Sequence, residues 1–291
     1  MDDIILQINL DNIESDPELL TTIGYACEKG TIFRQNYSAA LTLYKAAAEA
    51  GDAQALNNIG WMFQNGMGVE ENIEQAHTFY LAAAKKGNVT AQINLGNIYE
   101  YGLLDGTPNH ELCFLWYQAA AEQGSMTGIY NYANCYHAGM GVEQNYEKAF
   151  SLFKQLADAG YTDAMFYVGL YLQEGYLAEP DYEKARYYYR LGALDKEPCC
   201  LNQLGVLYGK GLGVKKDIHA AIDFYKEAAI QGDPLGYSNI AFFYENGDLG
   251  KPDIPAAVKL YQVAALAGEP NAIEALERLG YPQLDNYIDW E

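Results

Sequence analysis

Residues that could support catalysis or bind metal are scattered through the 291-residue sequence. The four histidines, His77, His110, His137 and His219, lie far apart and lack the spacing of a metal site. A zinc site needs three or four converging His, Cys, Asp or Glu side chains. No nucleophile motif, catalytic triad or paired-carboxylate pattern stands out, so we expect no catalytic residue, no metal and no cofactor. The sequence therefore predicts a protein that is not an enzyme.

Cysteines and glycines that resemble functional motifs have simpler explanations. The five cysteines form no C-x-x-C pair, and their odd, irregular set is typical of a reducing compartment. We therefore expect a cytoplasmic protein. The G-x-G triplets at 66–68, 139–141 and 211–213 would indicate a dinucleotide site only after a strand and with a third glycine. They recur instead between predicted helices, which indicates turns.

The charge balance narrows the classes of partner. Asp and Glu number 39 and Lys and Arg 18, so 39 minus 18 gives a net charge of −21. Such an acidic chain repels phosphate backbones and anionic lipids, so we expect no nucleic acid and no membrane as partner. A basic protein or peptide fits better, and mimicry of nucleic acid toward a basic protein is a variant of this prediction. No run approaches the roughly 20 apolar residues that span a bilayer.

One unit repeats along most of the chain, with a period of 36 residues and one step of 37. Each copy contains an anchor position that is glycine or alanine. The anchors are Gly24, Gly60, Gly96, Ala133, Gly169, Gly205 and Ala241. The aromatic residues 20 or 21 positions later are Tyr44, Tyr80, Tyr117, Phe153, Tyr189, Tyr225 and Tyr261. Apolar residues at helical spacing predict two helices in each copy, for example over 53–65 and 73–86 in the second copy.

The repeats divide the chain into seven copies and two ends. The predicted copies are 16–51, 52–87, 88–124, 125–160, 161–196, 197–232 and 233–268. We expect residues 1–15 to cap the first copy, and 269–291 to form a capping helix and an acidic tail, because a terminal repeat cannot leave its apolar face exposed. The predicted fold is an all-α solenoid of helix-turn-helix repeats.

Recurrent small and aromatic positions predict close packing between helices. An alanine, or a cysteine at Cys113, recurs four residues before each aromatic. Small residues there let the second helix approach its neighbours. The recurrent tyrosines then fill the space between helices, with the hydroxyl reaching an acceptor. We therefore expect the tyrosines at repeat positions to be buried.

Three motifs within the copies point to a known family. The third copy contains the stretch AQINLGNIY from Ala91 to Tyr99. G-x-G-V loops, as at 66–69, and Ala-Ala-x-x-Gly endings, as at 83–87, recur in other copies. In these motifs the chain resembles the Sel-one-like repeat family, a relative of the tetratricopeptide repeats. The resemblance implies a right-handed superhelix of stacked helix pairs that serves as an adaptor for protein assemblies.

The tetratricopeptide register implies where a partner would bind. In that register the first helix of each copy lines a concave face, and positions −3, −2, +1, +4 and +5 from the anchor are exposed. The candidate partner-binding residues are Tyr25, Glu28, Asn58, Trp61, Asn94, Asn97, Glu100, Tyr101, Tyr130, Asn131, Asn134, His137, Phe166, Glu174, Gln203, Asn239, Phe242 and Glu245.

Three kinds of side chain recur among these candidates. Asn or Gln occupies −2 in five of the seven copies and would suit the backbone of a bound segment, with hydrogen bonding inside the protein as the alternative. Aromatic residues at −3 and +1 are typical interface anchors, unless the helix is rotated so that some enter the core. Glutamates at +4 and +5 are opposed only by Lys29 and Lys210. These positions therefore lack the cluster of lysines and arginines that would bind the C-terminal carboxylate of a peptide, and we expect no recognition of a free carboxylate there.

The leading functional hypothesis is a non-enzymatic scaffold or adaptor. It would bind a basic protein or peptide in a concave groove lined by acidic and aromatic side chains. The alternative is an immunity or antitoxin protein that neutralises a basic effector toxin, because strong acidity suits both roles. We expect a monomer or a weak homo-oligomer.

Overall fold

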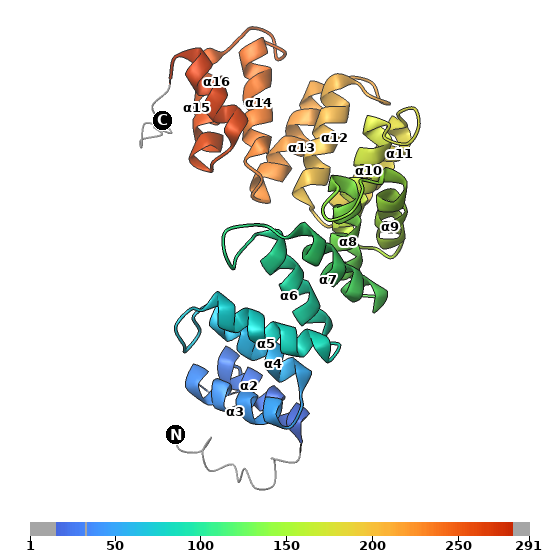
Figure 1. The fold of residues 1–291 in the computed structure, drawn as a ribbon. Helices are drawn as coiled ribbons and strands as arrows, with labels where there is room; N and C mark the ends of the chain where they lie inside the picture. The colour runs from blue at the N-terminus through green and yellow to red at the C-terminus, as the bar shows by residue number, and fades with distance from the viewer. Residues whose placement is uncertain (1–15, 33, 282–291) are drawn as a thin grey trace. The chain divides into compact units, whose positions relative to one another are not determined.

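The structure is a computed structural model that describes residues 16–32 and 34–281 (Figure 1). These residues form fifteen helices and no strand, so the prediction of an all-α fold is confirmed. The expected N-terminal cap at 1–15 and the acidic tail at 282–291 lie outside the described residues.

The chain divides into two compact units, one up to Asn145 and one from Tyr146 onward. The helices of the first unit are α2 (Pro17–Lys29), α3 (Tyr37–Glu49), α4 (Ala53–Gln64), α5 (Ile73–Lys85), α6 (Val89–Glu100), α7 (His110–Glu122) and α8 (Met126–Ala138). Those of the second unit are α9 (Tyr146–Asp158), α10 (Thr162–Glu174), α11 (Tyr182–Leu194), α12 (Pro198–Lys210), α13 (Ile218–Ile230), α14 (Leu235–Asn246), α15 (Ile254–Leu266) and α16 (Pro270–Leu279). Within each unit, every helix packs against the next one along the chain.

Local chemistry explains where the helices begin and end. The Asp52 carboxylate accepts hydrogen bonds from two backbone N–H groups in the first turn of α4, and the Asn72 side chain accepts one at the start of α5. These caps satisfy donors that have no partner inside the helix. Glycine in the left-handed conformation ends the second helix of most copies, as at Gly87 with φ 88°. In the fifth copy Lys196 adopts this conformation with φ 60°, although its Cβ disfavours it.

The core of each copy forms where the aromatic ring of the second helix lies on the anchor of the first. A Cβ added at Gly24 would lie 2.7 Å from the Tyr44 ring, and one added at Gly60 would lie 2.7 Å from the Tyr80 ring. The same arrangement places Tyr117 on Gly96, Tyr189 on Gly169 and Tyr225 on Gly205. All five tyrosines are at most 4% exposed, so the prediction that they are buried is confirmed.

The recurrent small residues are buried between the helices, as predicted. Those four residues before each aromatic are Ala40, Ala76, Cys113, Ala149, Ala185, Ala221 and Ala257, and each is 0% exposed. The backbone oxygen of Ala76 would lie 3.2 Å from a Cβ added at Gly60. The two helices of a copy therefore approach each other closely at both the small position and the anchor.

The helix after the seventh copy covers that copy's apolar face. α16 buries Ala272, Ala275 and Leu276 against α15. The Glu269 carboxylate caps α16 by accepting hydrogen bonds from backbone N–H groups of its first turn. A helix thus lies in the segment for which we predict a cap, and its side chains Glu274 and Arg278 also line a hollow of the surface.

The contact between ring and anchor predicts the effect of a single added methyl group. Alanine in place of an unobstructed glycine inside a helix stabilises by about 1 kcal/mol. At Gly96, however, the methyl group would overlap the Tyr117 ring. We expect Gly96→Ala to destabilise the protein by about 1–3 kcal/mol, as overpacked cores do, and to lower the urea midpoint.

The control for this measurement is Thr90→Ala, at an exposed position of the same helix. Its effect should stay within about 0.5 kcal/mol. An increase in stability for Gly96→Ala would contradict the packing described here.

Candidate partner-binding surface

The candidate residues lie on or at the end of the first helix of each copy, but they differ in exposure. Tyr25, Tyr101 and Phe242 expose 51%, 64% and 54% of their surface, and Glu174 is also exposed. Glu28 is buried, and the remaining candidates are half-buried. Large exposed aromatic side chains are typical anchors of protein interfaces. Tyr25 and Phe242 occupy the same +1 position, one in each unit.

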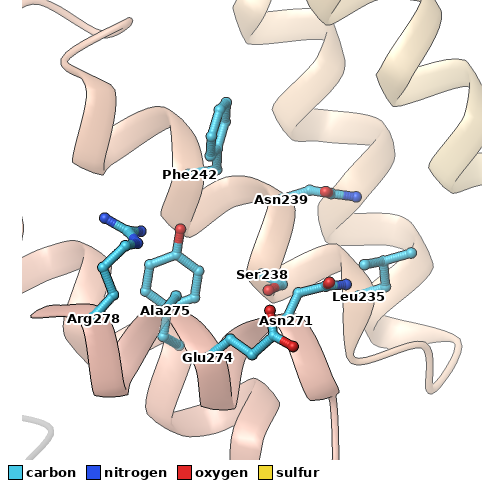
Figure 2. Close-up of a pocket in the computed structure, with 9 residues that line it drawn as sticks. Leu235, Ser238, Asn239, Phe242, Asn271, Glu274, Ala275 and Arg278 are labelled. Atoms are coloured by element: carbon cyan, nitrogen blue, oxygen red, sulfur yellow. The ribbon is translucent and has the colours of Figure 1, made fainter. Parts of the chain in front are cut away.

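Two hollows of the second unit share Asn239 and Phe242 in their walls. The smaller, of 380 Å³, lies between α14 and α16, where Asn271, Glu274 and Arg278 also line it (Figure 2). The larger, of 500 Å³, is lined by residues of α12, α13 and α14 and of the loops after α12 and α14. We define the Phe242 surface by the exposed and half-buried lining residues Val206, Lys210, Lys216, Leu235, Asn239, Phe242, Asp248, Asn271, Glu274 and Arg278.

Side chains of both signs line the Phe242 surface. Lys216 Nζ lies 3.5 Å from an Asp248 carboxylate oxygen. The Arg278 guanidinium donates to both carboxylate oxygens of Glu245, at 2.5 and 2.9 Å. This bidentate pair lowers the pKa of Glu245 and neutralises its charge. This part of the predicted face is therefore of mixed charge rather than acidic.

In the first unit, a lysine lies between two of the candidate aromatic residues. The Lys29 ammonium is 5.5 Å from the centre of the Tyr25 ring and 4.8 Å from the centre of the Trp61 ring. Its Nζ is also 2.7 Å from a carboxylate oxygen of Glu28. A cation within about 6 Å of a ring centre is attracted by the negative face of the ring. The +1 aromatics of the first two copies therefore already hold a positive charge.

The glutamates at +4 accept hydrogen bonds from buried tyrosines of their own copies. The pairs and their oxygen–oxygen distances are Tyr44 to Glu28 at 2.9 Å, Tyr117 to Glu100 at 2.6 Å and Tyr261 to Glu245 at 2.9 Å. Gln64 accepts from Tyr80 in the same way, at 2.8 Å. These three glutamates thus act as acceptors for buried hydroxyls, which need a hydrogen-bond partner, and their contact with a binding partner stays a prediction. Burial and the bond to Glu100 raise the pKa of Tyr117.

The +4 residue does not accept a hydrogen bond from the aromatic residue in every copy. In the fourth copy the aromatic is Phe153, which has no hydroxyl, and +4 is His137. In the sixth copy +4 is Gly209, and no described residue accepts a hydrogen bond from Tyr225, which lines the larger hollow. In the fifth copy the Tyr189 hydroxyl and the Gln173 Oε1 are buried, and neither has a hydrogen-bond partner among the described groups.

Side-chain amides at −2 form hydrogen bonds between copies. Asn94 donates to Asn57 Oδ1 at 3.1 Å, and Asn239 donates to Asn202 Oδ1 at 3.5 Å. In both cases the acceptor lies at −3 of the preceding copy. Gln203 Oε1 accepts from a glutamine of the fifth copy at 3.3 Å. These bonds favour the structural alternative for the amide ladder, and its contact with a partner stays a prediction.

The other candidates are half-buried within their units. Asn58 Oδ1 accepts from a glutamine one turn earlier at 2.8 Å, and Asn97 Oδ1 accepts from the Tyr117 hydroxyl at 2.6 Å. The Phe166 ring lies 6.3 Å from the Tyr189 ring, centre to centre, so Phe166 fits the alternative in which the helix turns an aromatic toward the core. The half-buried candidates of the fourth copy are Tyr130, Asn131, Asn134 and His137.

No metal centre forms among the residues that the structure describes. In 16–32 and 34–281, no three His, Cys, Asp or Glu side chains are grouped so as to hold an ion. All five cysteines are free thiols, and burial raises the pKa of Cys27 and Cys200. A raised pKa disfavours the thiolate that attacks a substrate. None of the described helices is long and apolar enough to cross a membrane.

The contribution of α16 is the part of the surface that sequence reasoning missed. The sequence pattern predicts only a cap and a tail over 269–291, yet Glu274 and Arg278 line the smaller hollow (Figure 2). The repeat period indicates this contribution, because Arg278 follows Phe242 by 36 residues. Arg278 therefore occupies the +1 position of a helix that keeps the register without the motif.

Seven matches to the Sel1 repeat cover most of the chain. The matched residues are 23–52, 53–88, 89–125, 127–161, 162–195, 200–233 and 234–269. The chain belongs to the Sel1 repeat family. The resemblance found in the sequence motifs is thus confirmed. Sel1 repeat proteins serve as scaffolds for interactions between proteins.

Several solved structures have a similar fold. A Sel1 repeat protein from Oxalobacter formigenes is 28% identical, with a TM-score of 0.76 over 84% of this chain and 96% of that one. A protective antigen of uropathogenic Escherichia coli strains, which displays an SLR fold, is 28% identical with a TM-score of 0.74. That match covers 94% of this Sel1 chain but only 59% of the antigen. An immunity protein from Pseudomonas aeruginosa, 22% identical with a TM-score of 0.50 over 66% of this chain and 70% of that one, shows the fold alone. Comparison with curated proteins gives no match.

Removing a hydroxyl should lower the free energy of unfolding more where the tyrosine has a described hydrogen-bond acceptor than where it has none. Tyr117→Phe leaves the half-buried Glu100 carboxylate without its donor, so we expect a loss of about 1–3 kcal/mol in the free energy of unfolding. Tyr225→Phe removes a hydroxyl that has no described acceptor, so we expect a change within about 0.5 kcal/mol. Urea unfolding of both variants tests the comparison. Equal losses would show that the +4 residue is not the acceptor that matters.

Proposed function

We propose that this Sel1 repeat protein is a non-enzymatic scaffold that binds a segment of a basic protein partner along the first helices of its copies. The observation that carries the proposal is Phe242, which is 54% exposed and stands between two adjoining hollows. It occupies a position that the repeat register assigns to partner contact. The proposed setting is the cytoplasm, with the scaffold a monomer or a weak homo-oligomer.

The chemistry of the Phe242 surface suits a protein segment. Exposed Phe242 offers an apolar anchor, and burying an aromatic side chain in an interface stabilises a complex. Asn239 beside it carries both a donor and an acceptor, which suit the backbone of a bound segment. Lys210, Glu274 and Arg278 at the edges of the two hollows could then select charged side chains. Together these groups form an apolar centre with a polar rim, as in ordinary protein interfaces.

The main support for a basic partner is the net charge of the whole chain, because the Phe242 surface itself carries side chains of both signs. The net charge of −21 attracts a basic protein over distances of about a Debye length and speeds its encounter. Raising the salt concentration should therefore slow association more than it changes dissociation. The mixed charges at the Phe242 surface act only on the docked segment.

Neutralisation of a basic effector is the alternative form of the same binding function. The net charge supports it equally, because masking a basic toxin surface also requires acidic complementarity. The likeness to the Pseudomonas aeruginosa immunity protein concerns the fold alone. The identity of the captured partner distinguishes the two: a toxin whose activity this chain abolishes would establish neutralisation.

An affinity capture with matched variants tests the proposal. Phe242→Ala removes the exposed anchor without a buried cavity, so the fold should persist while affinity for the partner falls about 30-fold, as for an interface hot spot. Tyr187→Ala is the control, because Tyr187 is 58% exposed on α11 and lines a different hollow of the same unit. The captured partner is then titrated against both variants by calorimetry.

Either of two outcomes would contradict the proposal. A partner that binds Phe242→Ala as tightly as the original protein does not use the Phe242 surface. A partner lost only on Tyr187→Ala binds the face formed by the second helices.

A further inference from the structure

The surroundings of Lys29 form a compact site for a positive charge. Two rings at equivalent positions of consecutive copies, Tyr25 and Trp61, lie within 5.5 and 4.8 Å of its ammonium. Glu28 adds a carboxylate oxygen at 2.7 Å. Aromatic faces together with a carboxylate are the groups that bind ammonium and guanidinium ions. We call Tyr25, Trp61 and Glu28 the cation seat.

The counter-ion of the seat is held in place by the core of its copy. The Glu28 side chain is 5% exposed, and its other carboxylate oxygen accepts from the Tyr44 hydroxyl at 2.9 Å. Tyr44 in turn lies on the Gly24 anchor. One Glu28 carboxylate oxygen thus accepts from the buried Tyr44 hydroxyl, and the other lies next to the Lys29 ammonium. The carboxylate of the seat is therefore held by buried contacts, whereas the Tyr25 ring is 51% exposed.

Lys29 is the residue of this arrangement that lies at a helix end. It is the last residue of α2, and its side chain is 40% exposed. A flexible side chain at a helix end can leave the seat by rotation about its own bonds, because no other part of the core rests on it. Another cation that replaces the Lys29 ammonium keeps the buried Glu28 carboxylate paired, so the exchange avoids the cost of an unpaired buried charge.

We infer that the cation seat receives a lysine or arginine side chain of the bound partner, and that Lys29 occupies it in the free protein. The inference rests on the proposed function, since it names the feature of a basic partner that the first unit recognises. Lys29 then acts as an internal competitor. Removing it should strengthen the binding of a cationic side chain rather than weaken it, which is the opposite of what an ordinary structural or contact residue would do.

The seat can be tested without the partner. The probe is Nα-acetyl-L-lysine N-methylamide, titrated into ¹⁵N-labelled protein while the indole N–H resonance of Trp61 is followed. We expect Lys29→Met to bind the probe about fivefold more tightly than the original protein, because the competing cation is gone. Glu28→Gln in the Lys29→Met background should reverse this gain. Gln64 shows that glutamine can accept the tyrosine hydroxyl at +4, so the core should be retained.

Matched controls separate the seat from general charge effects. Lys154→Met removes another lysine that has a carboxylate partner, Asp158, and an aromatic neighbour, Tyr188, but belongs to the second unit. It should bind the probe as the original protein does. The same compound acetylated at Nε lacks the charge and should not bind Lys29→Met.

The outcomes distinguish this inference from the proposed function. Equal binding by the Lys29→Met and Lys154→Met variants, or binding of the neutral compound to Lys29→Met, would overturn the seat whatever the partner capture shows. Tight probe binding by Lys29→Met would support the seat even where Phe242→Ala leaves partner binding unchanged and the proposed function fails.

Discussion

The contact between a tyrosine ring and a glycine anchor sets the spacing of the two helices in five of the seven copies. Glycine at the anchor lets the tyrosine ring lie against the backbone of the first helix, as Tyr80 does on Gly60. That position carries the hydroxyl to the residue at +4, which becomes its acceptor. One packing contact thus decides the roles of several positions, and four copies share the hydrogen bond from the tyrosine to the +4 residue.

The remaining positions of the first helix are those available to a partner. In four copies the +4 side chain accepts from a tyrosine, and part of the amide ladder is engaged between copies. At the +1 position, Tyr25 and Phe242 are more than half exposed, whereas Trp61 is half-buried and also packs against the core. This position carries Tyr25 and Trp61 in the first unit and Phe242 in the second, and its register continues to Arg278. Both the proposed docking surface and the cation seat are built on this position, whose residue type varies between copies from aromatic to asparagine to aliphatic.

The fold could be predicted because repetition exposes shared physical roles. Seven aligned copies identified the anchors, the buried tyrosines and the capped helix ends, which reflect local backbone and packing rules. The partners of individual polar groups could not be predicted. A glutamate such as Glu28 on a helix is equally compatible with solvent and with a buried hydroxyl, and only the path of both helices decides. For the aromatic Phe166, too, the sequence does not decide between the surface and the core, and its ring lies near the Tyr189 ring. Arg278 keeps the repeat spacing in a helix that lacks the repeat motif, and it lines the smaller hollow.

The most direct test of this account is site-specific photo-cross-linking in the native cell. Benzoylphenylalanine would replace Phe242 on a first helix and, in a separate variant, Tyr187 on a second helix; both native aromatic residues are more than half exposed. The account predicts one discrete covalent adduct with a basic protein from position 242 and none from position 187. An adduct from position 187 alone would place binding on the second helices and contradict the claim that the Sel1 copies bind through their +1 positions.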